Sequence, residues 1–147
     1  MPERLLLTTT HHPPWTERIA RTLVDIDGSD AEVVLLYVFN ERERDQVVEN
    51  LGIEGSVDIS ELAMRKADVS SAREVLDSAG ITYSVRGIES DVHADAILSV
   101  AEDEDVDRIY VYSRKRSPVG KAVFGSTLQD VILGAEVPVV VTPEASS

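Results

Sequence analysis

The most unusual local feature of the sequence is a run of bases without any acid between Arg108 and Gln129. The bases in this run are Arg108, Arg114, Lys115, Arg116 and Lys121. The run leads into Gly125-Ser126-Thr127, where the sequence predicts the start of a helix. A helix N-terminus exposes unpaired N–H groups and the positive end of its dipole, so it binds anions readily. The sequence therefore predicts an anion or phosphate site here, with Gly125 allowing close approach and the two hydroxyls donating.

A second interpretation of the same residues needs no ligand. Ser126-Thr127-Leu128-Gln129 has the S-x-x-Q form of a capping box, which satisfies the helix end internally. The basic run could also oppose the acidic body of its own domain or of a second subunit. The stretch is not a Walker A loop, because Gly120-Lys121 lacks the earlier glycine and Ala122 stands where Ser or Thr would hold magnesium.

Other chemistry-bearing residues give weaker signals. The chain has no cysteine, which excludes disulfides, zinc–thiolate sites, iron–sulfur clusters and cysteine nucleophiles. His11 and His12 are neighbours that would point apart in an extended loop, so no metal site is predicted. The sequence has no G-x-S-x-G nucleophile elbow, and no catalytic residue is predicted. Trp15 is expected to be a core or staple residue rather than a stacking platform.

The charge balance limits the possible partners. Across 147 residues, 27 acids and 14 bases give a net charge of −13, and only three of the bases are lysine. Nucleic acids and anionic lipids bind through basic groups, so neither is expected as a partner. Many acids, few lysines and no cysteine favour a protein adapted to a salt-rich cytoplasm, where molar salt shortens the Debye length to about 3 Å.

The length and the local patterns predict one soluble α/β domain over residues 1–147. No apolar stretch reaches the roughly 18 residues of a membrane span, and the first residues do not form the basic start of a signal peptide. Strand patterns fall at 5–9, 33–38, 81–85, 109–112 and 139–141, and helix patterns fall at 13–27, 59–79, 94–101 and 128–135. Residues 40–57 are interpreted as a charged surface excursion with a helical turn around 47–51.

Strictly alternating strands and helices indicate an open parallel sheet with helices on both faces. In such a sheet, ligands bind beyond the carboxyl ends of the strands, beside the point where the strand order reverses. The candidate site should therefore be built from the loops at 8–13, 38–45 and 112–120.

The end of the chain resembles the universal stress protein family. The resemblance is carried by Ser113-Arg-Lys-Arg-Ser-Pro-Val-Gly-Lys-Ala-Val-Phe-Gly-Ser-Thr, then an amphipathic helix, then Val137-Pro-Val-Val-Val. The Arg-Lys-Arg-Ser-Pro-x-Gly-Lys-Ala form is similar to the versions from salt-loving archaea. The resemblance implies a five-stranded parallel sheet of order 3-2-1-4-5 with the adenine nucleotide alpha hydrolase-like fold. One branch of that family binds ATP.

In that branch the adenosine side is held by an Asp after the first strand and by a main-chain contact after the second strand. By the resemblance, the Asp falls on Thr10, which offers a hydroxyl but no carboxylate. The main-chain contact falls on Val38, which is suitable because no side chain is needed.

The phosphates in that branch are held by a G-x-x-G-x9-G-S/T loop, and this chain matches it in part. The two early glycines fall on Tyr112 and Lys115, while the later pair is kept as Gly125 and Ser126, followed by Thr127. A tyrosine ring beside the nucleotide predicts steric occlusion, and Lys115 cannot easily adopt the positive φ of glycine. Ser113, beside Tyr112, completes the set of candidate ligand-binding residues.

Val139, Val140 and Val141 form a short apolar strand that should lie at the sheet edge. An unpaired apolar edge invites a second copy, so a homodimer through this last strand is expected, as the resemblance also implies.

Two functions follow from these patterns. The first is a non-enzymatic stress-response protein with a partly degenerate nucleotide site, acting by ligand sensing or protein contacts. The alternative is a nucleotide-binding switch with at most slow ATP hydrolysis. The candidate ligands are ATP, AMP or phosphate, and no cofactor is assigned firmly. An acyl or phosphate hydrolase has no nucleophile–base pair to support it.

Overall fold

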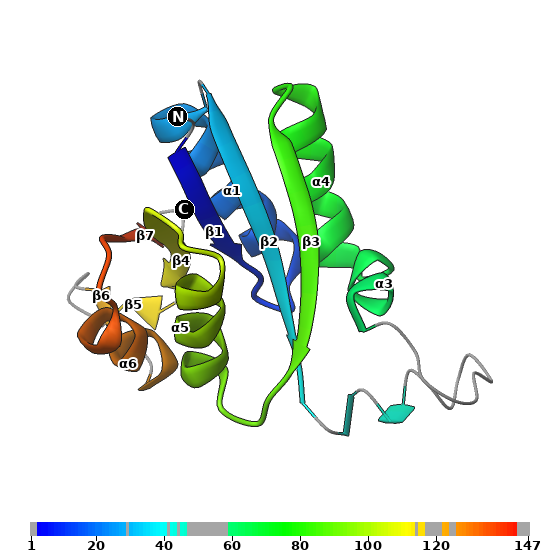
Figure 1. Cartoon of the computed structure of the whole chain (residues 1–147), viewed down its shortest axis with the longest axis vertical. Coiled ribbons are helices and arrows are strands. Elements are labelled where there is room, and N and C mark those ends of the chain that lie inside the picture. The colour runs from blue at the N-terminus through cyan, green and yellow to red at the C-terminus, as the bar shows by residue number, and fades with distance from the viewer. Residues whose placement is uncertain are drawn as a thin grey trace.

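A computed structural model describes residues 3–28, 30–40, 42–43, 45–46, 59–113, 115–116, 122–123 and 126–143. Figure 1 shows the arrangement of their strands and helices. The elements are β1 (Glu3–Thr8), α1 (Pro13–Asp27), β2 (Ala31–Phe39), α3 (Ile59–Met64), α4 (Ala67–Ser78), β3 (Thr82–Glu89), α5 (His93–Asp103), β4 (Arg108–Ser113), β5 (Lys115–Arg116), β6 (Ala122–Val123), α6 (Ser126–Gly134) and β7 (Val139–Pro143).

The main sheet has five parallel strands in the order β3-β2-β1-β4-β7, which confirms the predicted order 3-2-1-4-5. The central strand β1 pairs with both neighbours, so that Leu6 lies opposite Val34 and Ile109. A second, two-stranded antiparallel ribbon of β5 and β6 was not predicted, and it lies in the stretch interpreted as the loop after β4.

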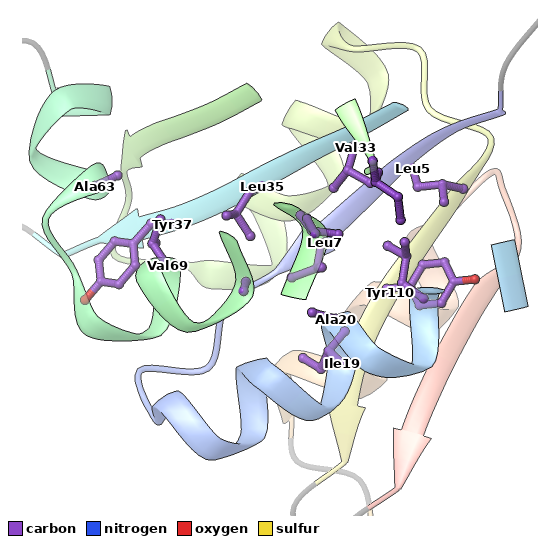
Figure 2. Packing of buried hydrophobic residues seen from close by; sticks show 14 of the residues in the cluster. Leu5, Leu7, Ile19, Ala20, Val33, Leu35, Tyr37, Ala63, Val69 and Tyr110 are labelled. Carbon is purple, nitrogen blue, oxygen red and sulfur yellow. The ribbon is translucent and has the colours of Figure 1, made fainter. Parts of the chain in front are cut away.

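Helices cover both faces of the sheet, as the alternation predicts. Leu5 and Leu7 of β1 face α1, α3 and α4, whereas Leu6 between them faces α5 and α6. Figure 2 shows the first of these clusters, with Ile19 and Ala20 of α1 beneath the strand residues. Because each face is covered, the inner strands are apolar without interruption, and each fully buried Leu, Ile or Val contributes about 1.5–3 kcal/mol.

The segment 59–79 forms two helices, where the apolar spacing predicted one. The helix breaks at Arg65 and Lys66, and Lys66 is extended with φ −76° and ψ 140°. The two pieces pack on different partners, because α3 lies on β3 and α4 lies on α1. The contact of α3 is close: a Cβ on Gly87 would meet the Ile59 carbonyl oxygen at 2.5 Å, and the Gly87 N–H donates to Ser60 Oγ at 3.0 Å. The helical turn expected at 47–51 lies outside the described residues.

Arginines neutralise acids at the amino end of the sheet. Arg4 binds Glu104 through Nη2 and Glu32 through Nη1 at 3.1 Å, and Arg86 Nη1 binds Glu104 Oε1 at 3.0 Å. The hydrogen bond from Arg4 holds the pKa of Glu104 below its usual value. Arg108 also lies at this end, where it binds Asp27 Oδ1 at 3.0 Å. The base that begins the acid-free run therefore lies far from the predicted anion site.

Within the described part of the chain, no helix combines the length and the apolar character needed to cross a membrane.

Candidate functional site

A cavity of about 420 Å³ opens at the carboxyl ends of β1 and β4. The chain leaves β1 through α1 on one face of the sheet and enters β4 from α5 on the other, so these strands flank the point where the strand order reverses. The volume is within the usual range for small-molecule sites. The lining residues are Thr8, Thr9, Thr10, His11, Trp15, His93, Ile97, Val111, Tyr112, Ser113, Ser126, Thr127, Leu128 and Val131.

Two threonines fasten the end of β1 to its neighbours. Thr8 Oγ1 donates to the Tyr110 carbonyl oxygen at 2.9 Å on the β4 side. Thr9 Oγ1 donates to the Leu36 carbonyl oxygen at 3.0 Å on the β2 side. These hydroxyls extend the cross-strand bonding beyond the backbone ladder, so the loop that follows starts from a fixed position.

One end of the cavity presents hydroxyl groups. Ser113 is 3% exposed, and its Oγ has no hydrogen-bond partner among the described residues. An unpaired buried hydroxyl costs about 1–3 kcal/mol, which a ligand oxygen here would recover. Ser126 and Thr127 are exposed in the first turn of α6, a turn that carries no acid. The helix N-terminus and the hydroxyls thus make this end suitable for an anion.

An aromatic pair forms another wall. Trp15 and Tyr112 stack with ring centroids 5.4 Å apart and an interplanar angle of 13°, and His12 lies 4.0 Å from Trp15. The expectation that Trp15 is a core or staple residue was wrong, because it lines the cavity in the first turn of α1. The sequence feature that could have placed Trp15 at the cavity is Pro13-Pro14. These prolines set the start of α1 beside the carboxyl edge of the sheet. Beside the Tyr112 ring the 420 Å³ cavity remains open.

The hydroxyl of Thr10 is used within its own loop. Thr10 Oγ1 accepts from the His12 N–H at 3.1 Å and lies 2.9 Å from the His12 carbonyl oxygen and from Thr16 Oγ1. This bonding fixes the turn into α1. Thr10 therefore lines the cavity without a free hydroxyl for a ligand.

A buried carboxylate from α4 supports the same loop. Asp68 is 3% exposed, and its Oδ2 accepts from the His11 N–H at 3.1 Å and lies 3.5 Å from Thr16 Oγ1. His11 has a φ of 67°, a conformation that costs energy for a residue with a Cβ. Asp68 stabilises that conformation, and its place in the first turn of α4 suits the helix dipole.

A chain of hydrogen bonds runs from the loop to the segment after β2. Tyr37 Oη lies 2.8 Å from His11 Nδ1 and donates to Glu43 Oε2 at 2.5 Å, and Lys66 Nζ binds the same oxygen at 3.2 Å. Since Tyr37 donates to Glu43, His11 Nδ1 is assigned as the donor to Tyr37. Burial, then the bond to Glu43, raises the pKa of Tyr37, which keeps its proton.

Beside this chain a second chamber, of about 370 Å³, shares His11 and His93 with the main cavity. Its lining residues are His11, Asn40, Arg42, Glu43, Gln46 and His93. The His11 and His93 rings are 5.5 Å apart, and burial and then His11 lower the pKa of His93. The sequence analysis missed Tyr37, Glu43, Lys66 and Asp68, whose contacts no local pattern indicates.

The structure brings together most of the predicted ligand-binding residues. Thr10, Tyr112, Ser113, Ser126 and Thr127 line the main cavity. Val38 does not line it: the residue is buried in β2 and belongs to the cluster beneath α5 and α6. The Lys115 side chain and Gly125 lie outside the described residues. Val139, Val140 and Val141 lie in β7 at the sheet edge.

The doubly wound sheet and the cavity at its reversal point define a class of α/β protein whose ligands bind at the carboxyl edge. The universal stress protein family model matches residues 2–143, and the chain belongs to that family. Its fold is the adenine nucleotide alpha hydrolase-like fold.

Solved structures share this fold at low sequence identity. The protein MJ0577 is 23% identical, with a TM-score of 0.71, over 100% of this chain and 99% of that one. A universal stress protein in complex with cAMP is 13% identical, with a TM-score of 0.65, over 98% of each chain. The universal stress protein from Archaeoglobus fulgidus in complex with dAMP is 16% identical, with a TM-score of 0.61, over 96% of this chain and 97% of that one. A search of curated protein sequences found no match.

Proposed function

We propose that this universal stress protein binds an adenine nucleotide in the cavity between β1 and β4 and acts as a sensor of that ligand. The buried Ser113 hydroxyl, unpaired among the described residues, carries this proposal because Ser113 lines a cavity of ligand size. The helix N-terminus beside it supports a phosphate position at the α6 end. The complexes of related structures with cAMP and dAMP support the choice of nucleotide.

The site is partly degenerate compared with the ATP-binding pattern. The Thr10 hydroxyl forms hydrogen bonds within its own loop, and the Tyr112 ring forms part of the cavity wall. A cavity of about 420 Å³, to which the described residues Ser113, Ser126 and Thr127 bring hydroxyls, suits a nucleoside monophosphate better than a long polyphosphate. The protein then works through ligand-dependent protein contacts.

We propose no catalytic role for the site. Ser113 has a buried hydroxyl in the cavity, and no base within the described residues forms a hydrogen bond to its Oγ. The alternative is a nucleotide switch with slow ATP hydrolysis. Phosphate release in the presence of ATP and magnesium, at a rate abolished by the Ser113→Ala change, would favour that alternative.

Removing the hydroxyls at the α6 end should weaken nucleotide binding. We expect Ser113→Ala and the double change Ser126→Ala/Thr127→Ala each to raise the Kd for AMP about tenfold, since a hydrogen bond to a charged group contributes about 1.5–3 kcal/mol. Trp15, the one tryptophan of the sequence, lines the cavity, so its fluorescence reports the titration.

The matched control is Ser84→Ala, an exposed serine on β3 at the opposite side of the sheet. Its Kd should equal that of the wild type. Wild-type protein that binds neither AMP, cAMP nor ATP, or hydroxyl variants that bind AMP normally, would refute the proposed function.

We propose that the protein is a homodimer paired through β7. This strand lies at the edge of the sheet, and Val139, Val140 and Val141 are each only partly buried. In α6, the helix that precedes β7 in the chain, Leu133 is 76% accessible. An apolar edge strand is a typical self-association site, and exposed apolar side chains favour association.

We propose that the protein works in a salt-rich cytoplasm, because its net charge of −13 and its arginine-rich, lysine-poor base content suit high ionic strength. Raising KCl from about 0.1 M to 1 M shortens the Debye length from about 10 Å to 3 Å and screens the repulsion between acids. We expect Tm to rise by about 5 °C. Sucrose at the same concentration is the control for effects other than screening. A Tm that falls or stays constant in KCl would contradict the proposal.

A further inference from the structure

Glu43 is held firmly by one of its two carboxylate oxygens. Tyr37 Oη donates to Oε2 at 2.5 Å, and Lys66 Nζ binds the same atom at 3.2 Å. Figure 2 shows the Tyr37 ring in the apolar cluster, with its hydroxyl directed away from that cluster. Phe39 and Tyr37 also hold the Lys66 ammonium, which lies 5.5 Å and 5.4 Å from their ring centroids. The carboxylate is thus fixed by groups from β2 and from the break between α3 and α4.

The other carboxylate oxygen of Glu43, Oε1, is free to accept a hydrogen bond. Oε1 is buried and has no hydrogen-bond partner among the described residues. The residue lines the second chamber, which shares His11 and His93 with the main cavity. A fixed, buried carboxylate oxygen beside a ligand-sized space calls for an N–H or O–H donor.

Charge decides which part of a nucleotide can reach this oxygen. The phosphate is favoured at the α6 end, where a helix N-terminus and hydroxyls converge, and it is repelled by a carboxylate. Arg42 also lines the second chamber, but its side chain is exposed. The base and sugar, which are neutral and carry donors, therefore face Glu43.

We propose that Glu43 determines the nucleotide specificity of this protein, with Oε1 accepting a hydrogen bond from the base amine or a sugar hydroxyl. The inference rests on the nucleotide-binding function proposed above and extends it to the choice of ligand. Glu43 supplies a carboxylate from the segment after β2. Thr10, after β1, offers only a hydroxyl, which is already bonded within its own loop. Tyr37 is a positioning residue in this arrangement, because it acts through Glu43.

The change Glu43→Gln gives a directional test. The oxygen site bonded by Tyr37 and Lys66 has two donors, so the amide oxygen of glutamine will take it and the NH₂ group will take the place of Oε1. The acceptor at the position of Oε1 then becomes a donor. A base that offers a carbonyl in place of the amine is thereby favoured over one that offers the amine.

The experiment measures Kd for AMP, IMP and 2′-deoxy-AMP by Trp15 fluorescence and calorimetry. IMP replaces the base amine with a carbonyl, and the deoxy compound lacks a sugar hydroxyl, so the two analogues separate the two donors. We expect the wild type to bind AMP at least about tenfold more tightly than one analogue. In Glu43→Gln that preference disappears, and it reverses towards IMP if the donor is the base amine.

Two variants make the result specific. Asp45→Asn removes the same charge from an exposed residue of the same segment and should keep the wild-type ratios. Tyr37→Phe leaves the carboxylate but removes its buried anchor, and it should reduce the preference while leaving circular dichroism unchanged. Two results overturn the role of Glu43 but leave the proposed function standing. The first is a Glu43→Gln variant with the Kd ratios of the wild type, and the second is a wild type with equal affinity for all three nucleotides. Absence of any nucleotide binding in the wild type overturns the proposed function and this inference together.

Discussion

Replacing Asp68 by alanine is expected to lower the free energy of unfolding by about 2–3 kcal/mol. The carboxylate is 3% exposed and accepts from the His11 N–H at 3.1 Å, so its loss leaves a donor unpaired in the loop after β1. It also removes a negative charge from the first turn of α4, which the helix dipole favours. Chemical denaturation monitored by Trp15 fluorescence measures the change.

The same substitution should weaken ligand binding, because Asp68 holds a loop that forms part of the cavity wall. His11 keeps a φ of 67° while its N–H is bonded to Asp68, and Thr10 and His11 both line the cavity. Without that bond the loop can relax to a lower-energy backbone conformation. We expect the Kd for AMP to rise together with the loss of stability.

Two further variants separate the carboxylate's contact from general effects of charge. Asp77→Ala removes an acid from the exposed end of the same helix and should change stability by no more than about 0.5 kcal/mol. Asp68→Asn keeps an oxygen acceptor at the same place, so its free energy of unfolding should fall by less than that of the alanine variant. If Asp68→Ala unfolds at the same denaturant concentration as Asp77→Ala, the carboxylate does not support the loop.

The architecture could be predicted from the sequence because it depends on local periodicity. Uninterrupted apolar runs such as 33–38 predicted inner strands covered on both faces, and the strict alternation of elements predicted a parallel sheet. The carboxyl edge as the place of the cavity followed from the topology. Ser126 and Thr127 could be placed there because the sequence pattern at a helix start predicts where the helix begins.

The chemistry inside the site could not be predicted, because it depends on contacts between distant residues. Asp68 and His11 are 57 positions apart, and Tyr37 and His11 are 26 apart. No spacing rule connects such pairs. The basic run shows the opposite error: nearness in sequence suggested one cluster, but Arg108 pairs with Asp27 at the amino end of the sheet. Strand β4 is six residues long and spans about 20 Å when extended, with Arg108 at one end and Ser113 at the other.

A lysine at position 140 is expected to convert the proposed homodimer into a monomer of 16.1 kDa. On one side β7 pairs with β4, and no described strand pairs with its other side. A symmetric partner strand would bring the two copies of residue 140 close to the two-fold axis, where two ammonium groups repel and must lose water. Light scattering after size exclusion in 1 M KCl, with circular dichroism to verify folding, measures the outcome.

The opposite edge of the sheet supplies the matched control for Val140→Lys. Ser84→Lys places the same charge on β3, whose side chain at this position is exposed, and should leave the dimer intact. If Ser84→Lys rather than Val140→Lys gives the monomer, copies pair through β3. A wild type that is already monomeric, or a Val140→Lys variant that remains twice 16.1 kDa, removes β7 as the interface. Because β4 links β7 to the cavity through Tyr112 and Ser113, opposite Thr142 and Pro143, pairing at this edge places the proposed interface one strand away from the ligand.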